Sequence, residues 1–525
     1  MSPEHADVIV IGGGPNGLTA AAYLARAGAR VVVLEKRFEW GGTMATDDYS
    51  TPFFYNLCQY ALPLGRDLPP YADLELERMA VRLVEPDPVA AFVPTSGDEP
   101  LVVGRDAAAL GALRPLIDAA DRVVAPLLYV PPLPVDQLEA ALDHDDGALA
   151  LELARMTPLE AARRTSEERA AALVRYLCGL AGFDAPDGQL GLIGALALAR
   201  ALRPTIAVGG AKALANGLFR AGAGAGAEYR PVADVRRIEL NGTRLRAVCA
   251  DGRSYEASAV VSTLDPKTTF LELLAETDVP DAVRHAAEAW RLDSSGRFIA
   301  HFGIKGAPPR LTDREAGEAF MQVIGFAGAD AVGEHLDAAA GGQLPALQAG
   351  HLTVTTRHDP TQAAAGPYGP LHTLRFETPA PARLPDADWV RARADVRGRC
   401  RDMIERQTRG LEAARELFAF ADSPRDLERR FRTTRNGSVR HGALVPEQTF
   451  TDRPHADCSA AHTPISGLYL GGGGAHPGLP GSLGGGYLAA RAVCEDLGQE
   501  PWWAEPPLVR RAREAGLLPE PAVAA

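Results

Sequence analysis

A glycine-rich turn between a strand and a helix, close to the N-terminus, constrains this chain more than any other feature. Residues 7–11 are an apolar, β-branched run of the length of a buried parallel strand. The pattern GxGxxG occupies residues 12–17, and residues 18–27 have the composition of a helix. Residues 30–34 are a second such strand, which ends at Glu35. Strand, GxGxxG, helix, strand and acid in this order predict a Rossmann-type unit that binds a dinucleotide.

Each fixed position of this pattern has a physical task. Gly12 permits a tight turn, Gly14 leaves room for a pyrophosphate beside the backbone, and Gly17 lets the helix pack closely on the sheet. The helix N-terminus, which contains Pro15 and Asn16, offers free N–H groups and a partial positive charge to the phosphates. A carboxylate at position 35 accepts hydrogen bonds from ribose hydroxyls. The motif alone leaves NAD and FAD open.

The residues after Glu35 favour FAD. After five residues the chain reads Gly41-Gly42-Thr43, and a diglycine there lets the backbone run along a flavin diphosphate and its ribityl chain. This spacing resembles that of the flavoprotein superfamily that contains monoamine oxidases and carotenoid desaturases. Lys36 and Arg37 are candidates to flank the adenosine, and a solvated basic pair is the alternative.

The C-terminal region carries a second glycine-rich junction. A predicted strand at residues 467–470 is followed by many glycines up to residue 486 and by a predicted helix at 487–497. So many glycines indicate either repeated positive φ or the close approach of a large group such as a flavin, with a flexible loop as the alternative. The candidate contacts to the cofactor are Gly473, Gly474, Gly484 and Gly485. No acid ends a following strand, so one bound dinucleotide is expected.

The middle of the chain adds strands to the same unit. After Val208-Gly209-Gly210 the pattern predicts a helix at 211–221. Asn-Gly and Asp-Gly pairs at 241–242 and 251–252 are hairpin signals, so the following stretch is predicted to be a small meander and a buried strand. The predicted strands are 228–230, 234–240, 244–249 and 255–263.

Taken together, these segments resemble the phytoene desaturase family in its broad sense, which includes carotenoid desaturases, carotene isomerases and retinol saturases. The matching segments are 7–43, 257–274, 436–454 and 463–493. The resemblance implies bound FAD and an α/β fold, with a Rossmann-type (GR2-like) FAD-binding domain and a discontinuous α+β substrate domain. It also implies that Val235 presents backbone to the adenine. Leu479-Pro480 and Leu488 depart from the family pattern near the expected flavin edge, so substrate type transfers least.

The resemblance further implies a division of the chain. The FAD-binding domain would comprise residues 1–75, 205–275 and 430–500, and the substrate-binding domain residues 76–204 and 276–429. Residues 110–203 have helical spacing that suits either a cavity roof or an ordinary core, and core is favoured for most of them. The tail, 501–525, is expected to dock on the body.

Three residues are candidates for catalysis. His476 lies in the second glycine-rich segment, where it would orient the substrate or stabilise the reduced ring, and fixing the loop is the alternative. His441 is a candidate for the active site, and Arg453 for catalysis or for bracing the C-terminal loop. Asp265, before Pro266, is favoured as a turn former over a base. No metal site is indicated.

These features predict an FAD-dependent oxidoreductase, a dehydrogenase or desaturase that moves hydride from a substrate C–H bond to flavin N5. The substrate is expected to be a small molecule, apolar or a natural-product intermediate. An amine or alcohol oxidase, and a non-redox isomerase or flavin-binding scaffold, are the alternatives. The electron acceptor (oxygen, a quinone or a protein) and the oligomeric state stay open.

Charge, cysteines and hydropathy limit the remaining partners. A net charge of -13 argues against nucleic acid. Six scattered cysteines form no CxxC pair, which favours a reducing cytoplasm over a disulfide framework. No apolar window reaches the ~18 residues of a membrane span, and residues 190–202 are predicted to be a buried helix. Peripheral contact with a membrane stays open.

Overall fold

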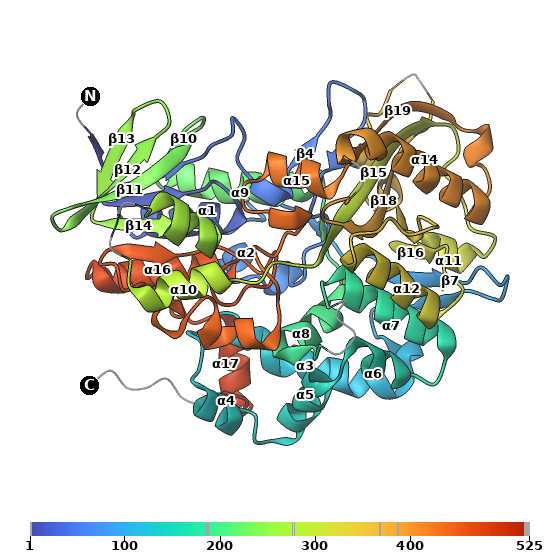
Figure 1. Ribbon diagram of the computed structural model, residues 1–525, viewed down its shortest axis with the longest axis horizontal. Coiled ribbons are helices and arrows are strands. Elements are labelled where there is room, and N and C mark those ends of the chain that lie inside the picture. The colour runs from blue at the N-terminus through green and yellow to red at the C-terminus, as the bar shows by residue number, and fades with distance from the viewer. Residues whose placement is uncertain are drawn as a thin grey trace.

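The computed structural model describes residues 3–183, 188–275, 277, 279–366, 369–385 and 388–518. One half of the molecule is built on a five-stranded parallel sheet in the order β10-β3-β2-β14-β20 (left in Figure 1). Its strands come from distant parts of the chain: β2 (Val8–Ile11), β3 (Val31–Leu34), β10 (Glu228–Arg230), β14 (Ala259–Ser262) and β20 (Leu468–Leu470). The Rossmann-type α/β fold predicted from the first glycine pattern is confirmed.

Successive side chains of β2 point to opposite faces of this sheet, and both faces are covered. Val8 and Val10 pack in one core with α1 (Pro15–Arg26), whereas Ile9 and Ile11 pack in a second core on the opposite face. Helix α1 in turn packs against α9 (Ala211–Gly224) and α16 (Gly484–Asp496). Burial on both faces is the reason why the strand is a continuous apolar run.

The second core lies beneath a four-stranded sheet in the order β1-β13-β12-β11. Its strands are β1 (Glu4–His5), β11 (Val235–Asn241), β12 (Arg244–Cys249) and β13 (Ser254–Ala257). The single strand predicted at 255–263 is wrong in one respect. The chain leaves this meander after Ala257 and enters the parallel sheet as β14, so the predicted strand is two strands in different sheets.

A seven-stranded mixed sheet forms the other half of the molecule, in the order β19-β15-β18-β17-β16-β7-β8 (right in Figure 1). One face packs against α14 (Trp389–Gln407) around Phe298 and Phe376. Its strands are β7 (Ala90–Val93), β8 (Leu101–Val103), β15 (Ser295–Lys305), β16 (Met321–Ile324), β17 (Gly350–Val354), β18 (Leu371–Pro381) and β19 (Arg415–Asp422). All described neighbours pair antiparallel except β16 and β7.

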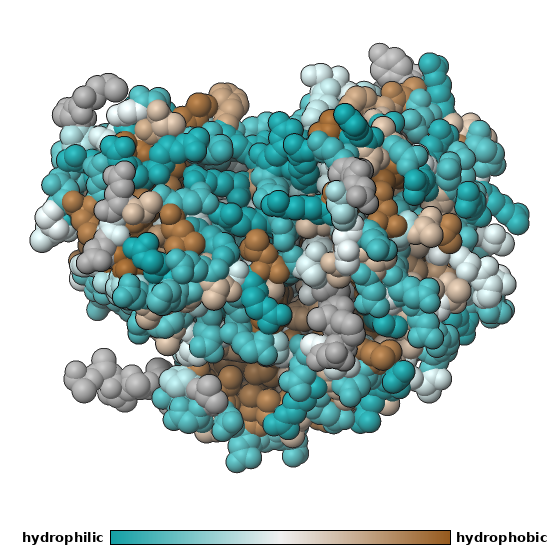
Figure 2. All heavy atoms as spheres, viewed as in Figure 1, coloured by the Kyte–Doolittle hydropathy of each residue, from teal (hydrophilic) through white to brown (hydrophobic). Residues whose placement is uncertain are grey.

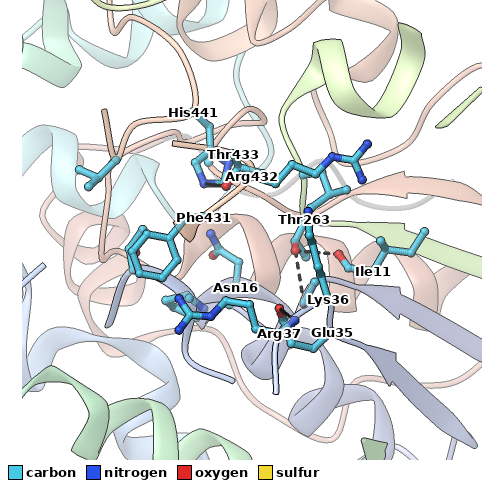
Figure 3. Close-up of a pocket in the computed structure, with 18 of the residues that line it drawn as sticks. Ile11, Asn16, Glu35, Lys36, Arg37, Thr263, Phe431, Arg432, Thr433 and His441 are labelled. Carbon is cyan, nitrogen blue, oxygen red and sulfur yellow. Dashed lines mark hydrogen bonds between the residues drawn. The ribbon is translucent and has the colours of Figure 1, made fainter. Parts of the chain in front are cut away.

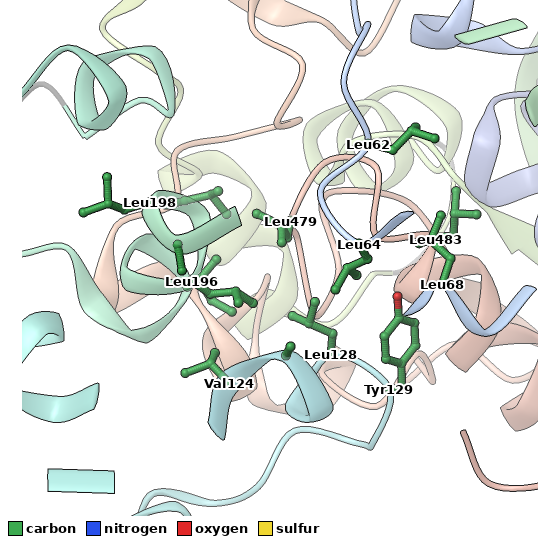
Figure 4. Packing of buried hydrophobic residues seen from close by; sticks show 14 of the residues in the cluster. Leu62, Leu64, Leu68, Val124, Leu128, Tyr129, Leu196, Leu198, Leu479 and Leu483 are labelled. Atoms are coloured by element: carbon green, nitrogen blue, oxygen red, sulfur yellow. The ribbon is translucent and has the colours of Figure 1, made fainter. Parts of the chain in front are cut away.

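Helices close the molecule below both sheets in Figure 1. They are α3 (Arg114–Leu127), α4 (Val135–Ala141), α5 (Asp145–Arg155), α6 (Pro158–Arg163), α7 (Glu168–Leu180), α8 (Gly191–Ala201) and α12 (Ala329–Ala340). The apolar run at 190–202 is the buried helix α8, as predicted. Figure 4 shows Leu196 and Val124 of two helices packed towards Leu64 and Leu479, which come from distant segments. This core ties the helices to both glycine-rich regions.

Shorter elements complete the chain. They are α2 (Pro69–Asp73), α10 (Asp281–Ala289), α11 (Arg314–Glu318), α13 (Thr355–His358), α15 (Pro424–Arg430), α17 (Pro507–Glu514), β4 (Thr46–Asp47), β5 (Tyr55–Asn56), β6 (Leu83–Val84) and β9 (Ile206–Ala207). The tail docks as predicted, because α17 packs on α3 and Trp502 donates a hydrogen bond to the Tyr23 carbonyl at 3.0 Å. Residues 519–525 of the predicted tail lie outside the described residues.

The domain boundaries given above stay a prediction. The parallel sheet and the mixed sheet use strands from different segments, 8–34 with 228–262 and 468–470 in the first, 90–103 with 295–422 in the second. The face shown in Figure 2 is mainly hydrophilic, with hydrophobic residues gathered low in the view. None of the described helices is both long and apolar enough to cross a membrane. All six cysteines are buried and unpaired.

Candidate functional site

A cavity with a volume of about 130 Å³ opens at the carboxyl ends of β2, β3 and β14. The ends of parallel strands are where α/β sheets hold dinucleotides. Figure 3 shows Asn16, Glu35 and Arg37 on one side of it and Phe431 and His441 across from them. The predicted cofactor contacts that line it are Gly12, Gly14, Pro15, Asn16, Glu35, Lys36, Arg37, Gly42, Thr43, Val235 and Gly473.

The three glycines of the first turn are used in three different ways. Gly14 lines the cavity, and no atom lies within 4 Å of a Cβ built on it, so the space beside its backbone is free for a phosphate. Gly12 has φ +100°, which glycine adopts without strain. Gly17 does not line the cavity. A Cβ on it would stand 1.9 Å from the Gly12 carbonyl oxygen, so there is no room for a side chain. Its task is helix packing, as the pattern predicts.

Glu35 is held in place by the backbone. One carboxylate oxygen accepts a hydrogen bond from the Gly13 N–H at 2.7 Å and the other from the Arg37 N–H at 2.8 Å. Burial raises the pKa of this carboxyl, against the effect of these hydrogen bonds. The carboxylate thus stays beside the cavity with lone pairs left for a ribose. The guanidinium of Arg37 lies 5.1 Å from the centre of the Phe431 ring.

The diglycine after Glu35 lies against the first turn. Gly41 has φ +105° and donates its N–H to the Gly13 carbonyl at 2.8 Å, so it braces the cavity from behind. A Cβ on Gly42 would lie 3.0 Å from the Gly14 Cα. Gly42 and Thr43 therefore bring bare backbone along the cavity wall next to Gly14, which is the placement that a diphosphate and ribityl chain require.

The C-terminal glycines contribute less to the cavity than predicted. Gly474, Gly484 and Gly485 do not line it. Cβ atoms there would lie 2.5 Å from Pro266, 2.7 Å from the Leu128 carbonyl and 2.8 Å from the Gly472 carbonyl, respectively. Close packing against neighbouring segments is the reason for these glycines. Helix α16 begins at Gly484, three residues before the predicted start.

The three candidate catalytic residues separate in the structure. His441 lines the cavity, lies beside Gly473, and its Nε2 is 3.0 Å from the Thr433 hydroxyl. Burial lowers the pKa of His441 to about 4, so the ring is neutral near pH 7. His476 lines neither this cavity nor the one described next, and its Nε2 meets the Leu127 carbonyl at 3.1 Å. It fixes the loop, which was the alternative to catalysis.

Arg453 is fully buried and also lines neither cavity. Its guanidinium donates to the carbonyls of Arg440 at 2.9 Å, of Gln448 at 3.0 Å and of Gly473 at 2.6 Å. A guanidinium whose donors are used on carbonyls is a brace for the loop. This geometry fits the bracing role offered for Arg453, and its catalytic role stays a prediction that these contacts do not support. Asp265 caps the following turn through the Thr268 N–H at 3.0 Å, as favoured.

A second cavity lies next to the first, with a volume of about 190 Å³. Gln59, Val439, Leu479 and Pro480 line both cavities, so this is where the two meet. Much of the second wall is apolar, and it includes Tyr60, Ala61, Leu62, Leu180, Ala197, Phe320, Met321 and Leu444. The floor, from β15, β17 and β18, is charged.

Sequence reasoning missed part of the wall. Leu479 and Pro480 were noted only as departures from a family pattern. Thr263 lies inside the segment 257–274 that carries the resemblance, and its hydroxyl donates to the Ile11 carbonyl at 2.8 Å. The stretch from Arg430 to Thr433 lines the cavity and had no signal, because it reaches β2 only through the tertiary fold. Gln59, Ala233, Asp234 and Leu264 are further lining residues without a motif.

Comparison with protein families supports the Rossmann-type assignment of the N-terminal region. Residues 10–65 match the model of an NAD(P)-binding Rossmann-like domain. Over almost its whole length the chain is similar to one of the subunits of limonene dehydrogenase from Castellaniella defragrans, with 31% identity over 557 aligned residues, 98% of this chain and 99% of that protein. It is 26% identical to pyridine nucleotide-disulfide oxidoreductase domain-containing protein 2 of Mus musculus, over 95% of this chain and 94% of that one.

Comparison with solved structures supports the fold. A variant of putrescine oxidase aligns with a TM-score of 0.63 at 16% identity, over 95% of this chain and 100% of that one. Cyclohexylamine oxidase from Brevibacterium oxydans aligns with a TM-score of 0.60 at 16% identity, over 94% of this chain and 99% of that one. At such identities the likeness concerns architecture.

Proposed function

We propose, from the premise that this chain belongs to the family of FAD-dependent oxidoreductases that includes the limonene dehydrogenase of Castellaniella defragrans, that it is a dehydrogenase of an apolar substrate. The observation that carries the proposal is the junction of the two cavities at Gln59, Val439, Leu479 and Pro480. A dinucleotide laid along the first cavity would present its far end at this junction, next to an apolar chamber large enough for a substrate.

The residues of the first cavity divide the work of holding FAD. Glu35 would bind the adenosine ribose, the bare backbone of Gly14 and Gly42 the diphosphate, and Val235 would lie beside the adenine. Gly473 and His441 also line the first cavity. When bound, FAD supplies a hydride acceptor at N5. His441, neutral by burial, would contribute shape and a hydrogen-bonding ring instead of a charge.

The second cavity would orient the substrate and exclude water. Leu479 and Pro480 sit at the junction, while Phe320 and Leu444 line the chamber beyond it. Transfer of an apolar molecule from water into such a space is favourable. The fit of the molecule then decides which C–H bond points at the junction. The printed name of the 31% identical relative, limonene dehydrogenase, supports a compact apolar substrate.

Within the family we propose that the chain stands near the phytoene desaturase branch. The support is the order of its segments, 7–43, 257–274, 436–454 and 463–493, along the whole chain. The last segment supplies Gly473, Leu479 and Pro480 to the cavity walls. Leu479-Pro480, which departs from the branch pattern, is at the junction and would change the substrate.

An amine oxidase is the runner-up, because putrescine oxidase and cyclohexylamine oxidase share the fold. The charge of the second cavity weighs against it. Arg297 and Arg375 line that cavity and share a single carboxylate, Glu377, and the remaining positive charge would repel a substrate ammonium. A non-redox isomerase would use the same cavities without net electron transfer.

The test is anaerobic reduction of the purified holoprotein. We expect a yellow protein whose flavin absorbance bleaches when limonene or a related cyclic alkene is added, and stays oxidised with cyclohexylamine. Bleaching by the amine alone, followed by rapid peroxide formation in air, would establish the oxidase instead. A product of unchanged mass with the flavin still oxidised would establish the isomerase. A protein that refuses added FAD would overturn the proposal.

The electron acceptor can be read from the same experiment. Slow reoxidation of the reduced flavin after air is admitted, together with rapid reoxidation by a soluble quinone or a partner protein, is the outcome we expect of a dehydrogenase. The relative is named as one subunit of its enzyme, which supports a second protein as the acceptor. Prompt oxygen consumption would contradict this part of the proposal.

A further inference from the structure

The floor of the second cavity is one face of the seven-stranded sheet. Side chains alternate along a strand, so Arg375 and Glu377 of β18 point to the same face. In the antiparallel register His351 of β17 pairs with Glu377, and Thr353 pairs with Arg375. All four residues line the cavity, together with Arg297 of β15. A patch of ionic side chains therefore faces an otherwise largely apolar chamber.

These side chains form one connected network around Glu377. Its carboxylate pairs with Arg375 and, at 3.0 Å, with Arg297. Arg375 also donates to the Cys58 carbonyl at 2.8 Å, and Arg297 to the Leu180 carbonyl at 2.9 Å. The Tyr176 hydroxyl lies 2.8 Å from His351 Nδ1. The network holds both guanidiniums in fixed places at the cavity wall.

The charges of this network do not cancel. Burial alone would raise the pKa of Glu377, but the two guanidiniums lower it to about 2, so the carboxylate is ionised. Burial lowers the pKa of His351 to about 4, so the ring is neutral near pH 7. Two arginines therefore face one carboxylate, which leaves an excess of one positive charge. The neighbouring Arg440 does not change this, because Asp293 pairs with it at 2.9 Å.

One donor of the network is also unused. The Nε–H of Arg375 has no hydrogen-bond partner among the described residues, although the side chain is only 5% exposed. A buried donor without a partner and an uncompensated buried charge both cost free energy. A bound anion at the cavity wall, where Arg297 is 21% exposed, would pair the excess charge. A planar guanidinium is the side chain best shaped to bind a carboxylate.

We infer that the second cavity takes a substrate with an apolar body and one carboxylate, which Arg375 and Arg297 bind while the body extends towards the junction. This inference rests on the proposed function, since it names the class of substrate for the same site. The network anchors one end of the molecule, so the position of the oxidised C–H bond is set by its distance from the carboxylate. A neutral hydrocarbon would fill the apolar walls but leave the excess charge unpaired.

The test compares ligands that differ at one carbon. Limonene, perillyl alcohol and perillate share one cyclic skeleton and carry a methyl, a hydroxymethyl and a carboxylate group at the same carbon. Decane, decanol and decanoate form a second, extended series. Binding to the holoprotein is measured by titration calorimetry, which needs no turnover. We expect the carboxylate of at least one series to bind about tenfold or more tightly than its alcohol and hydrocarbon.

Two variants locate the effect. Arg297→Gln removes the excess charge and keeps the Arg375–Glu377 pair, so we expect it to fold and to lose most of the preference for the carboxylate. Arg375→Gln should also lose most of the preference for the carboxylate. Its result is interpreted only if the variant retains its melting temperature and flavin content. Arg200→Gln is the matched control. Arg200 lines the same cavity, but its charge is paired with Asp121. Asp121 also pairs with Arg203, at 3.0 Å. The control variant should keep the preference.

Equal or weaker binding of both carboxylates to the unaltered holoprotein would overturn the inference. So would a preference that survives Arg297→Gln or disappears equally in Arg200→Gln. These outcomes leave the proposed function untouched if limonene still bleaches the flavin. Conversely, a holoprotein whose flavin no cyclic alkene reduces fails the proposed function, while calorimetry of the same holoprotein with perillate and decanoate still decides the inference.

Discussion

The side-chain oxygen of Asn16 accepts a hydrogen bond from the backbone N–H of Gly486 at 3.1 Å. This bond joins the first turn of α1 to the first turn of α16, 470 residues later in the chain. A Cβ on Gly486 would lie 2.1 Å from the Asn16 carbonyl oxygen, so the two backbones are in direct contact. The two glycine-rich regions of the sequence thus form one structure at the edge of the cofactor cavity.

Gly486→Ala should separate these two helices. A Cβ at 2.1 Å from a carbonyl oxygen forces a backbone shift, and overpacking of this kind costs about 1–3 kcal/mol. We expect a lower melting temperature and a lower flavin content after purification. Gly224→Ala, in α9, is the control, because no atom lies within 4 Å of its Cβ. If Gly486→Ala behaves like this control, the contact does not matter.

The glycines of the first turn predict opposite phenotypes for the same substitution. Gly17→Ala would clash with the Gly12 carbonyl and should lower the stability of the apoprotein. Gly14→Ala meets no protein atom and has φ -74°, so the apoprotein should keep its stability while the affinity for FAD falls about tenfold or more. Apoprotein melting and FAD titration separate the two. Unchanged affinity in Gly14→Ala would mean that the diphosphate lies elsewhere.

Glu35→Gln should weaken FAD binding with little change in shape. The amide that replaces the carboxylate puts an N–H₂ group against either the Gly13 or the Arg37 N–H, so one buried donor loses its acceptor. The loss is about 1–3 kcal/mol, shared between the turn and the ribose contact. Fluorescence titration of the apoprotein with FAD measures it. Glu75→Gln is the matched control, because this exposed carboxylate does not line the cavity, and an equal effect there would point to general charge.

The stability of the protein should fall as the pH drops below about 6.5. Burial lowers the pKa to about 4 in five histidines, which are His335, His351, His358, His441 and His476. Between pH 6.5 and 4 the unfolded chain binds protons at these rings and the folded chain does not, so each one reduces stability by up to about 1.4 kcal/mol per pH unit. Above pH 6.5 both states are neutral there, and the full stability is present.

Three carboxyls work in the opposite direction. Burial raises the pKa of Asp422 to about 6, and it also raises the pKa of Glu35 and of Asp73, so the folded state binds these protons before the unfolded state and gains stability as the pH falls. The five histidines outnumber these carboxyls, so we expect a net loss. Urea unfolding at pH 7, 6 and 5 measures it, and His358→Gln should reduce the slope by the share of one proton. A flat profile from pH 7 to 5 would show that these histidines protonate within the fold.

The docked tail should contribute measurably to stability. Trp503 is buried and lies edge-on to Tyr23, with ring centres 4.7 Å apart. Trp503→Ala removes this packing, which typically costs about 3–5 kcal/mol. Val390→Ala is the control, because that side chain is 56% exposed and should tolerate truncation. Denaturant unfolding compares the two, and equal midpoints would show that the tail is held only loosely.

Local patterns were sufficient where one short segment does the whole task. The strand–turn–helix at residues 7–27, the hairpin strand 244–249 and the apolar helix near 190–202 all occur where the sequence predicts them. Hydrophobic periodicity and turn residues act over a few neighbours, so they are readable without knowledge of the fold. The break between β13 and β14 was not readable, because no glycine or proline separates the two strands and only their partner strands differ.

The candidate site divides in the same way. Gly12, Gly14, Glu35, Gly42 and Thr43 lie at the cavity because a single βαβ unit positions them. His441 and His476 are similar in sequence context, yet the first faces the cavity and the second meets the Leu127 carbonyl. Their difference depends on helices and loops that are remote in the sequence, and no local pattern encodes it.

The sequence by itself therefore determined the nucleotide-binding unit, since the dihedral freedom of glycine and the alternation of buried strands are properties of the local chain. The tertiary structure alone decided what the second cavity can hold. Arg297, Arg375 and Glu377 have no motif in the sequence, and they become one ionic network only when β15 and β18 pair in register. Electrostatic interactions act through space, so they depend on distances that only the folded chain defines.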